Sequence, residues 1–199
     1  MPSLTFRNLP ASKKHAFTQM AFEEFAQKEY HEASISNIVR NLDIAKGSVY
    51  QYFSNKFDLF SYLTLQAHEK LIAIQQFVDA RDHNDLGSWF IERNMALVKF
   101  TKEFSNEFEL LCRVNNSRNI QFLELKNQLR SNELNMIESK VTTLIGDQTK
   151  VSDLSFVIWS VMHSYLENGS YKKESNDSII QNITNLSQTM FNNNSNLNA

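Results

Sequence analysis

The sequence predicts an all-α protein, and three observations support this prediction. Only 4 Gly and 2 Pro occur among 199 residues, so few positions interrupt a helix. Apolar residues recur with helical spacing through most of the chain, whereas no segment alternates with the period of two that is typical of strands. The chain is 42% hydrophobic and long enough to bury roughly 70% of its unfolded surface. We therefore expect about nine helices.

The N-terminal part of the chain has three short helical patterns followed by a long one. Phe17, Ala21 and Phe25 recur every four residues and define the apolar face of the first helix. Ser34 and Ser54 are favourable N-caps for the second and the fourth helix. The predicted helices span residues 11–28, 35–42 and 45–53, and the long helix runs from 54 past 74.

A polar segment over residues 79–85 separates these helices from the second half of the chain. The apolar stripes there again have helical spacing, and Gly146 follows one of them, as expected for a residue that ends a helix. The Asn-rich stretch 192–199 predicts a disordered tail. The predicted helices of this half span residues 85 or 88 to 100, 105–114, 120–145, 154–168 and 177–191.

Composition excludes several classes of function. The net charge of −2 excludes a basic nucleic-acid coat, although residues 1–56 carry seven basic against five acidic side chains and place any anion-binding function there. The single cysteine, Cys112, forms neither an internal disulfide nor a cysteine cage, and the five His have no metal-ligand spacing. No Gly-rich phosphate loop or nucleophile elbow supports an enzyme.

The expected location follows from two further features of the sequence. No apolar run reaches the ~18 residues that cross a bilayer. The N-terminal residues have no apolar segment typical of a secretory signal. We therefore expect a cytoplasmic protein that contacts no membrane and needs neither a metal nor a cofactor.

The short helices predicted over 35–42 and 45–53 are joined by a short turn, which is typical of a helix-turn-helix. The second helix is short enough to enter a major groove end-on. Its small residues let the backbone approach DNA, its Lys and Gln side chains reach base edges, and its Tyr hydroxyls donate to phosphates. The residues in these roles are Gly47, Ser48, Lys46, Gln51, Tyr50 and Tyr52.

At these positions the sequence resembles the TetR/AcrR family of bacterial transcription regulators, over roughly residues 11–65. The residues that carry the resemblance are Phe17, Ala21, Phe25, Tyr30, Ser34, Ile38, Val39, Ile44, Lys46, Gly47, Ser48, Val49, Tyr50, Phe53, Ser54, Asn55, Lys56 and Leu59. The resemblance implies a three-helix DNA-binding domain joined to a helical ligand-binding and dimerisation domain. It implies phosphate contacts by Ser34, Tyr50 and Lys56. It also implies that the following residues face the groove: Lys46, Gly47, Ser48, Gln51 and Tyr52.

Three positions depart from the family pattern. Glu29 and Asp43 stand where the family usually has Gly, and Ala45 stands where it usually has a Ser cap. Asp adopts a left-handed backbone at modest cost and Glu does so less readily. We therefore expect a small loss of stability and slightly weaker non-specific DNA binding.

The expected organisation is a helix-turn-helix domain over 1–55, a ligand-binding and dimerisation domain over 56–191 and a disordered tail over 192–199. One helix-turn-helix binds DNA poorly, whereas a two-fold dimer places two recognition helices ~34–36 Å apart or a multiple of that distance. The expected partners are therefore a palindromic double-stranded operator and a second copy of the chain. The last two helices form the predicted interface, because residues 154–162 are apolar on more than one face. The predicted interface residues are Leu154, Ile158, Trp159, Val161, Met162, Ile183, Leu186 and Met190.

The middle helices predict a ligand pocket. Residues 86–166 hold six Phe and both Trp, with few Gly and no clustered Arg, which favours an unidentified, partly apolar small molecule. Its binding would shift the long helix from 54 and release the operator, so we expect a repressor released by ligand. The candidate ligand-binding residues are Trp89, Arg93, Asn94, Phe100, Phe104, Phe108, Phe122, Trp159, His163 and Tyr165.

Two alternatives remain at this point. If the aromatic side chains simply fill the core at normal density, the protein is an effector-free DNA-binding protein on the same scaffold. If the helix-turn-helix is incidental, the protein is a helical enzyme or small-molecule carrier with no specific operator. A solid bundle would favour the first alternative, and the absence of a specific operator would favour the second.

Overall fold

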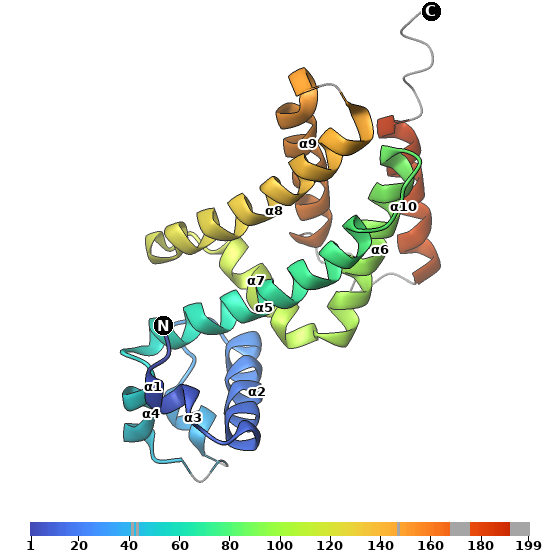
Figure 1. The fold of residues 1–199 in the computed structure, drawn as a ribbon. Coiled ribbons are helices and arrows are strands. Elements are labelled where there is room, and N and C mark those ends of the chain that lie inside the picture. The colour runs from blue at the N-terminus through green and yellow to red at the C-terminus, as the bar shows by residue number, and fades with distance from the viewer. Residues whose placement is uncertain (41, 43, 147, 168–175, 192–199) are drawn as a thin grey trace, which may run out of the picture. The chain divides into compact units, whose positions relative to one another are not determined.

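The computed structural model describes residues 1–40, 42, 44–146, 148–167 and 176–191, with only the backbone of 148, 165–167, 176 and 177. Throughout these residues the regular structure is helical, so the predicted fold class is confirmed (Figure 1). The α-helices are α1 Leu4–Arg7, α2 Ala11–Gln27, α3 Ile35–Val39, α4 Lys46–Tyr52, α5 Lys56–Asp79, α6 Leu86–Glu103, α7 Ser105–Asn116, α8 Leu123–Ile145, α9 Val151–Glu167 and α10 Asn176–Phe191. Two 3-10 turns, η1 Ile120–Phe122 and η2 Gln148–Lys150, precede α8 and α9.

Nine of these helices correspond to the predicted ones, and α1 is an addition. Four residues are too few to produce a helical periodicity, so the pattern of the sequence contains no signal for α1. Its start is fixed by Ser3, whose side chain accepts a hydrogen bond from the backbone N–H of Phe6 at 3.3 Å. The predicted end of α8 is confirmed, because Gly146 has a φ of 67° and its N–H donates to the carbonyl of Thr142.

The described residues form two compact units. Unit 1 comprises Met1–Lys70 and Phe104–Leu125, and unit 2 comprises Leu71–Glu103 and the described part of Lys126–Ala199. Each unit is therefore discontinuous along the chain, and helices α5 and α8 contribute residues to both. The boundary expected between residues 55 and 56 concerns a division of function and stays a prediction, while the predicted tail 192–199 lies outside the described residues.

Unit 1 has an aromatic core. Phe6, Phe17 and Phe53 pack together, with ring centroids 4.9 to 6.2 Å apart, where α1, α2 and the end of α4 meet. A second cluster places the ring of Phe122 at 5.0 Å from Phe60 and at 5.3 Å from Tyr30. These contacts bring η1 and α5 together with the loop that follows α2. Helices α3 and α4 belong to the same unit.

Unit 2 is held together by a close approach of α6 and α10. A Cβ on Gly87 would lie 3.0 Å from the hydroxyl oxygen of Ser187, which is closer than most real Cβ contacts. The same hydroxyl donates to the carbonyl of Gly87 at 3.1 Å. Trp89, Phe90 and Phe100 of α6 are at most 1% exposed, so this helix forms the centre of the apolar core.

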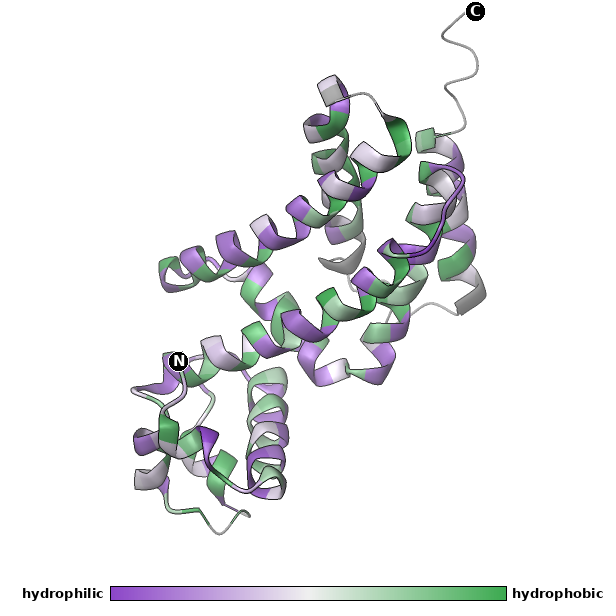
Figure 2. Ribbon diagram, in the orientation of Figure 1, coloured by the Kyte–Doolittle hydropathy of each residue, from purple (hydrophilic) through white to green (hydrophobic). Residues whose placement is uncertain are grey.

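The helices are mostly amphipathic, as the alternation of purple and green along their ribbons shows (Figure 2). No described helix combines the length and the apolar character that crossing a membrane requires.

Candidate nucleic-acid interface

Helices α3 and α4 are two consecutive short helices, as a helix-turn-helix requires. Helix α3 buries Ile35, Ile38 and Val39, and α4 buries Val49 and Tyr52. Each helix therefore has one apolar face that packs into unit 1 and one face that is free to meet a ligand. Positions 41 and 43 of the connecting segment lie outside the described residues, and with them the expected effect of Asp43.

The outer face of α4 carries most of the predicted groove-facing residues. Lys46, Gly47, Tyr50 and Gln51 are all exposed, and their spacing of one, four and five residues places them on one side of the helix. Tyr50 is 51% exposed, which is unusual for so large an aromatic side chain. Ser48 is half-buried. A Cβ added to Gly47 would have no atom within 4 Å, so the surface there is open.

The side chain of Tyr52 points into unit 1 and not toward the predicted groove-facing side of α4. It is only 8% exposed, and its ring centroid lies 5.7 Å from that of Phe6 and 6.3 Å from that of Phe17. Its position three residues after Val49 places it on the inward face of α4, which explains the correction. A contact of its hydroxyl with phosphate stays a prediction.

Glu24 organises the start of α3, a role that the sequence pattern did not reveal. Its Oε1 accepts hydrogen bonds from the N–H of Ser34 at 2.8 Å and from Nδ2 of Asn37 at 3.0 Å, and Lys28 donates to the same oxygen at 2.9 Å. Ser34 makes no side-chain capping bond with α3. The carboxylate of α2 therefore binds donors at the start of α3, and the hydroxyl of Ser34 is not used as a cap.

The environment of Glu24 makes unit 1 sensitive to acid. Burial raises the pKa of its carboxyl, but hydrogen bonds from Lys28, Ser34 and Asn37 outweigh burial and hold the pKa below its ordinary value of 4.5. A depressed carboxyl pKa contributes stability that is present above about pH 4.5 and is lost as the pH falls through the folded-state pKa.

We expect Glu24→Gln to lower the free energy of unfolding by about 1–2 kcal/mol at pH 7, because it weakens charge-assisted hydrogen bonds at the start of α3. The difference from the wild type should shrink as the pH falls below about 4.5 and through the lowered folded-state pKa, because the wild-type carboxyl then becomes protonated as well. Urea unfolding at pH 7 and at pH 3.5 measures both effects. Glu23→Gln, on the exposed side of α2, is the control, and a difference that persists undiminished in acid would contradict this role.

Lys56 closes the loop between α2 and α3. Its Nζ donates to the carbonyls of Tyr30 at 2.7 Å, Ala33 at 3.0 Å and His31 at 3.3 Å, and it lies 4.6 Å from the centroid of the Tyr30 ring. Burial lowers the pKa of this ammonium group. A lysine has three N–H donors, and all three have partners here. The phosphate contact expected of Lys56 stays a prediction, and it would require one of these bonds to open.

Glu29, which stands where the resembling family usually has Gly, has a specific partner. Its Oε1 accepts a hydrogen bond from Nη1 of Arg113 at 2.5 Å, and Nε of Arg113 donates to the carbonyl of Ala26 at 3.1 Å. Arg113 belongs to α7, so this residue binds the C-terminal end of α2 across 87 positions of the chain. The side chain of Glu29 thus connects two helices of unit 1.

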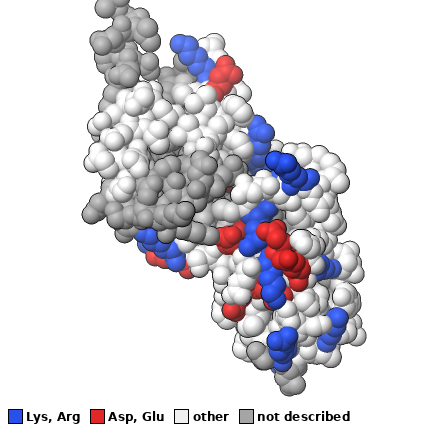
Figure 3. All heavy atoms as spheres, turned by 180° about the vertical axis from the view of Figure 1, so that it is seen from behind, with Lys and Arg blue, Asp and Glu red and all other residues white. Residues whose placement is uncertain are grey.

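Charged side chains are dispersed over one face of the molecule. On the face shown in Figure 3, Lys and Arg side chains appear as separate groups interspersed with Asp and Glu, and they form no continuous basic surface. Electrostatic attraction to phosphate contributes much of the affinity of DNA-binding proteins. On the face shown, the dispersed charge would offer phosphate groups only a small attraction.

The predicted ligand-binding residues whose side chains are described are divided between the two units. Trp89, Arg93 and Phe100 are each 0% exposed, and Asn94 is 3% exposed. Phe122 packs in the aromatic core of unit 1. Phe104 and Phe108 belong to the same unit, whereas the other described candidates belong to unit 2. The side chain of Tyr165 lies outside the described residues. Most of these aromatic rings therefore contribute to packing.

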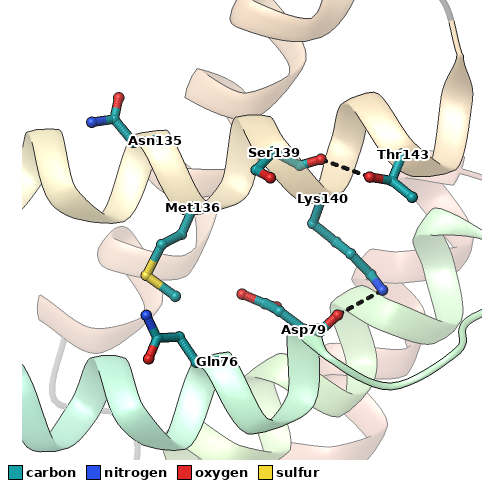
Figure 4. A pocket seen from close by; sticks show the side chains of 7 residues that line it. All are labelled: Gln76, Asp79, Asn135, Met136, Ser139, Lys140 and Thr143. Atoms are coloured by element: carbon teal, nitrogen blue, oxygen red, sulfur yellow. Dashed lines mark hydrogen bonds between the residues drawn. The ribbon is translucent and has the colours of Figure 1, made fainter.

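A different set of residues in unit 2 lines a groove between α5 and α8, with a cavity volume of about 420 Å³ (Figure 4). The lining residues are Gln76, Asp79, Asn135, Met136, Ser139, Lys140 and Thr143. Lys140 is held at one end, because its Nζ donates to the carbonyls of Asp79 and Arg81 at 2.9 Å. The predicted ligand-binding residues are absent from the lining of this groove, where every lining side chain except that of Met136 carries a polar group.

The predicted dimer residues divide into two groups. Ile158, Met162 and Ile183 are at most 4% exposed within a single chain, so they pack inside unit 2 and are corrected to core residues. The half-buried members of the predicted interface are Leu154, Trp159, Val161, Leu186 and Met190. The large apolar side chains exposed on these two helices are Phe156 at 46%, Val157 at 47% and Ile180 at 39%.

Comparison with known proteins agrees with this geometry. Residues 18–63, which include α3 and α4, match the model of the bacterial regulatory proteins of the tetR family. A TetR family transcriptional regulator from Chloroflexus aurantiacus has a similar structure, with a TM-score of 0.74 and 21% sequence identity over 95% of this chain and 96% of that chain. The sequence matches no curated protein.

Two further solved structures share the fold. GusR from Salmonella enterica has a TM-score of 0.73 and 15% identity, with 92% of this chain and 97% of that chain covered. FadR from Bacillus subtilis, a transcriptional regulator solved in complex with stearoyl-CoA, has a TM-score of 0.72 and 14% identity, with 87% and 96% covered. The predicted resemblance is confirmed: residues 18–63 match the tetR-family model, and the chain has the fold of TetR-family transcriptional regulators.

Proposed function

We propose that the protein is a homodimeric transcriptional repressor, which binds a palindromic operator through α4 and releases it when a small, partly apolar ligand binds. The observation that carries this proposal is the exposed face of α4, where Lys46, Gly47, Tyr50 and Gln51 lie together. This role requires no catalysis, metal or cofactor, and its place of action is the cytoplasm.

In the proposed complex, different residues of the interface position the protein and read the bases. Gln51 and Lys46 extend from α4 to base edges, where amide and ammonium groups recognise the bases. Tyr50 and Ser34, whose hydroxyl makes no capping bond with α3, bind phosphate oxygens. These contacts fix the position of the helix without reading the base sequence. Gly47 lets the backbone of α4 come close to the DNA.

The dimer follows from the small size of this interface. One copy of α4 offers few base contacts, so two copies are needed for specific binding. Phe156 and Val157 on α9, with Ile180 on α10, leave apolar surface exposed that a second copy of the chain would cover.

Two observations support a ligand-responsive regulator. The related FadR was solved with stearoyl-CoA bound, and unit 2 of this chain has a groove of about 420 Å³, within the usual size of small-molecule sites. Met136 gives the groove an apolar surface between amide and hydroxyl groups. The effector-free alternative is favoured by the complete burial of Trp89 and Phe100, because rings that fill the core cannot also line a cavity.

The proposal is tested by selecting operator duplexes from a random pool with the wild-type protein and measuring the affinity of Gly47→Ala for them. Alanine at this helical position should raise the free energy of unfolding by about 0.5–1 kcal/mol, since a Cβ there has no neighbour within 4 Å. The same Cβ should obstruct the approach of α4 to the groove and weaken operator binding roughly tenfold or more.

Gln19→Ala, an exposed substitution in α2 of the same unit, is the matched control and should leave operator affinity unchanged. A stabilised Gly47→Ala protein that binds the operator as tightly as the wild type would show that α4 does not enter the groove at this position. Selection of no common sequence by the wild type would overturn the proposed function itself.

A further inference from the structure

The C-terminal end of α4 is held by residues that precede the segment matched by the tetR-family model. The backbone N–H of Ser3 donates to the carbonyl of Tyr52 at 2.9 Å, and the hydroxyl of Ser3 donates to the carbonyl of Gln51 at 2.7 Å. The family match begins at residue 18, so helix α1 and its cap are features of this chain outside that match.

These two carbonyls belong to the last turn of α4, where they have no partner within the helix. A helix as short as α4, with seven residues, is marginal by itself, because few internal hydrogen bonds offset the cost of ordering its backbone. Ser3 supplies donors to two of the orphan carbonyls. The direction of the last turn of α4 is therefore fixed from outside the helix.

The same hydroxyl also fixes the start of α1. The Ser3 Oγ accepts a hydrogen bond from the N–H of Phe6 while it donates to Gln51, so one atom connects the first turn of α1 with the last turn of α4. At the other end of α1, Nζ of Lys14 in α2 donates to the carbonyl of Arg7 at 2.9 Å. Helix α1 is thus held at both ends.

The middle of α1 is anchored by Phe6, which is 1% exposed. Its ring centroid lies 4.9 Å from that of Phe53, 5.7 Å from that of Tyr52 and 5.6 Å from that of Tyr62. Two of these neighbours are at the C-terminal end of α4, and the third belongs to α5. Phe6 therefore packs the end of α4 against the rest of unit 1.

We propose that Ser3 and Phe6 are positioning residues for DNA recognition, which act through α4 without contacting DNA. This inference rests on the proposed function, since it assigns α4 to the groove. Gln51 is the point of connection, because its carbonyl is bound by Ser3 while its side chain is exposed on the face proposed to read bases. Fixing the peptide of Gln51 fixes the direction in which its amide points.

The test uses Ser3→Ala in the full chain, with the operator selected by the wild type and a random duplex as probes. The variant loses the hydroxyl bond to Gln51 and the cap of α1, and we expect operator affinity to fall roughly 3- to 10-fold. Affinity for the random duplex and the dependence of binding on salt should not change, because no phosphate contact is removed. Ser3→Thr keeps a hydroxyl and should restore operator affinity.

Amide hydrogen exchange provides a readout that does not depend on DNA. Exchange of the amides of residues 49–53 should become faster in Ser3→Ala, while the amides of α2 keep their wild-type rates. Leu4→Ala, at a position 74% exposed on α1, controls for the substitution of a neighbour, and Phe22→Leu controls for a general loss of stability in unit 1. Neither control should alter operator affinity.

Three results would overturn this inference. Equal losses on the operator and the random duplex would indicate a direct phosphate contact. An unchanged operator affinity in Ser3→Ala would remove the positioning role, and so would a Phe22→Leu protein that loses as much affinity as Ser3→Ala. A wild-type protein without any preferred duplex would overturn the proposed function as well, so the failure of the two proposals is distinguishable.

Discussion

Asp79→Ala is expected to lower the free energy of unfolding by about 3–5 kcal/mol, because it leaves a buried guanidinium without its counter-ion. The carboxylate of Asp79 is paired with Nη1 of Arg93 and also accepts a hydrogen bond from Nε1 of Trp89 at 2.8 Å. The Arg93 side chain is only 1% exposed, and Nη2 donates to Oε1 of Gln75 at 2.9 Å. Its Nε already lacks a hydrogen-bond partner.

Urea unfolding followed by circular dichroism measures this loss. Asp82→Ala, an exposed acidic residue three positions further along the chain, is the control and should change stability by less than about 0.5 kcal/mol. The double replacement of Asp79 by Leu and Arg93 by Met should recover much of the loss, because it removes both charges and keeps the volume filled. A loss below about 1 kcal/mol for Asp79→Ala would show that the pair does not stabilise unit 2.

The second large effect is expected from Val157→Asp. Val157 is 47% exposed on α9, so a carboxylate at this position is tolerated in a single chain but is buried without a partner if two copies meet there. We expect a folded monomer with operator affinity reduced at least about 100-fold, since one recognition helix then replaces two. Sedimentation velocity and operator titration measure the two consequences.

Met95→Asp is the matched control, because Met95 is a similarly exposed apolar side chain at 43% but belongs to α6. It should leave both the oligomeric state and operator binding unchanged. If Val157→Asp still sediments as a dimer, the interface between copies lies on another face of the chain.

The succession of helices follows from local patterns, which is why it could be predicted. The spacing of Phe17, Ala21 and Phe25 defines the buried face of α2, and the three side chains are at most 1% exposed in the structure. The groove-facing residues of α4 were predicted instead from the helix-turn-helix pattern and the family resemblance, and of these Tyr52 is buried. Periodicity identifies which residues share a face, and this information is local to each helix.

The remainder depends on contacts between distant positions, about which periodicity contains no information. The cap that Glu24 provides for α3 joins residues ten positions apart, and Ser3 and Gln51 are 48 positions apart. The periodicity of α9 places Ile158 on an apolar face. It does not show whether that face packs inside the same chain or against a second copy. Trp89 and Arg93 have residue types that could bind a ligand, but the structure uses both in the pair with Asp79.

The bond between Arg113 and the end of α2 affects how the protein is made. Helix α7 packs on α2, and both belong to unit 1, although unit 2 residues are translated between them. A nascent chain that has emerged only as far as residue 70 therefore exposes the face of α2 that α7 will cover. Unit 1 becomes complete only after residue 125 has left the ribosome, so its assembly is late in synthesis even though α4 is translated early.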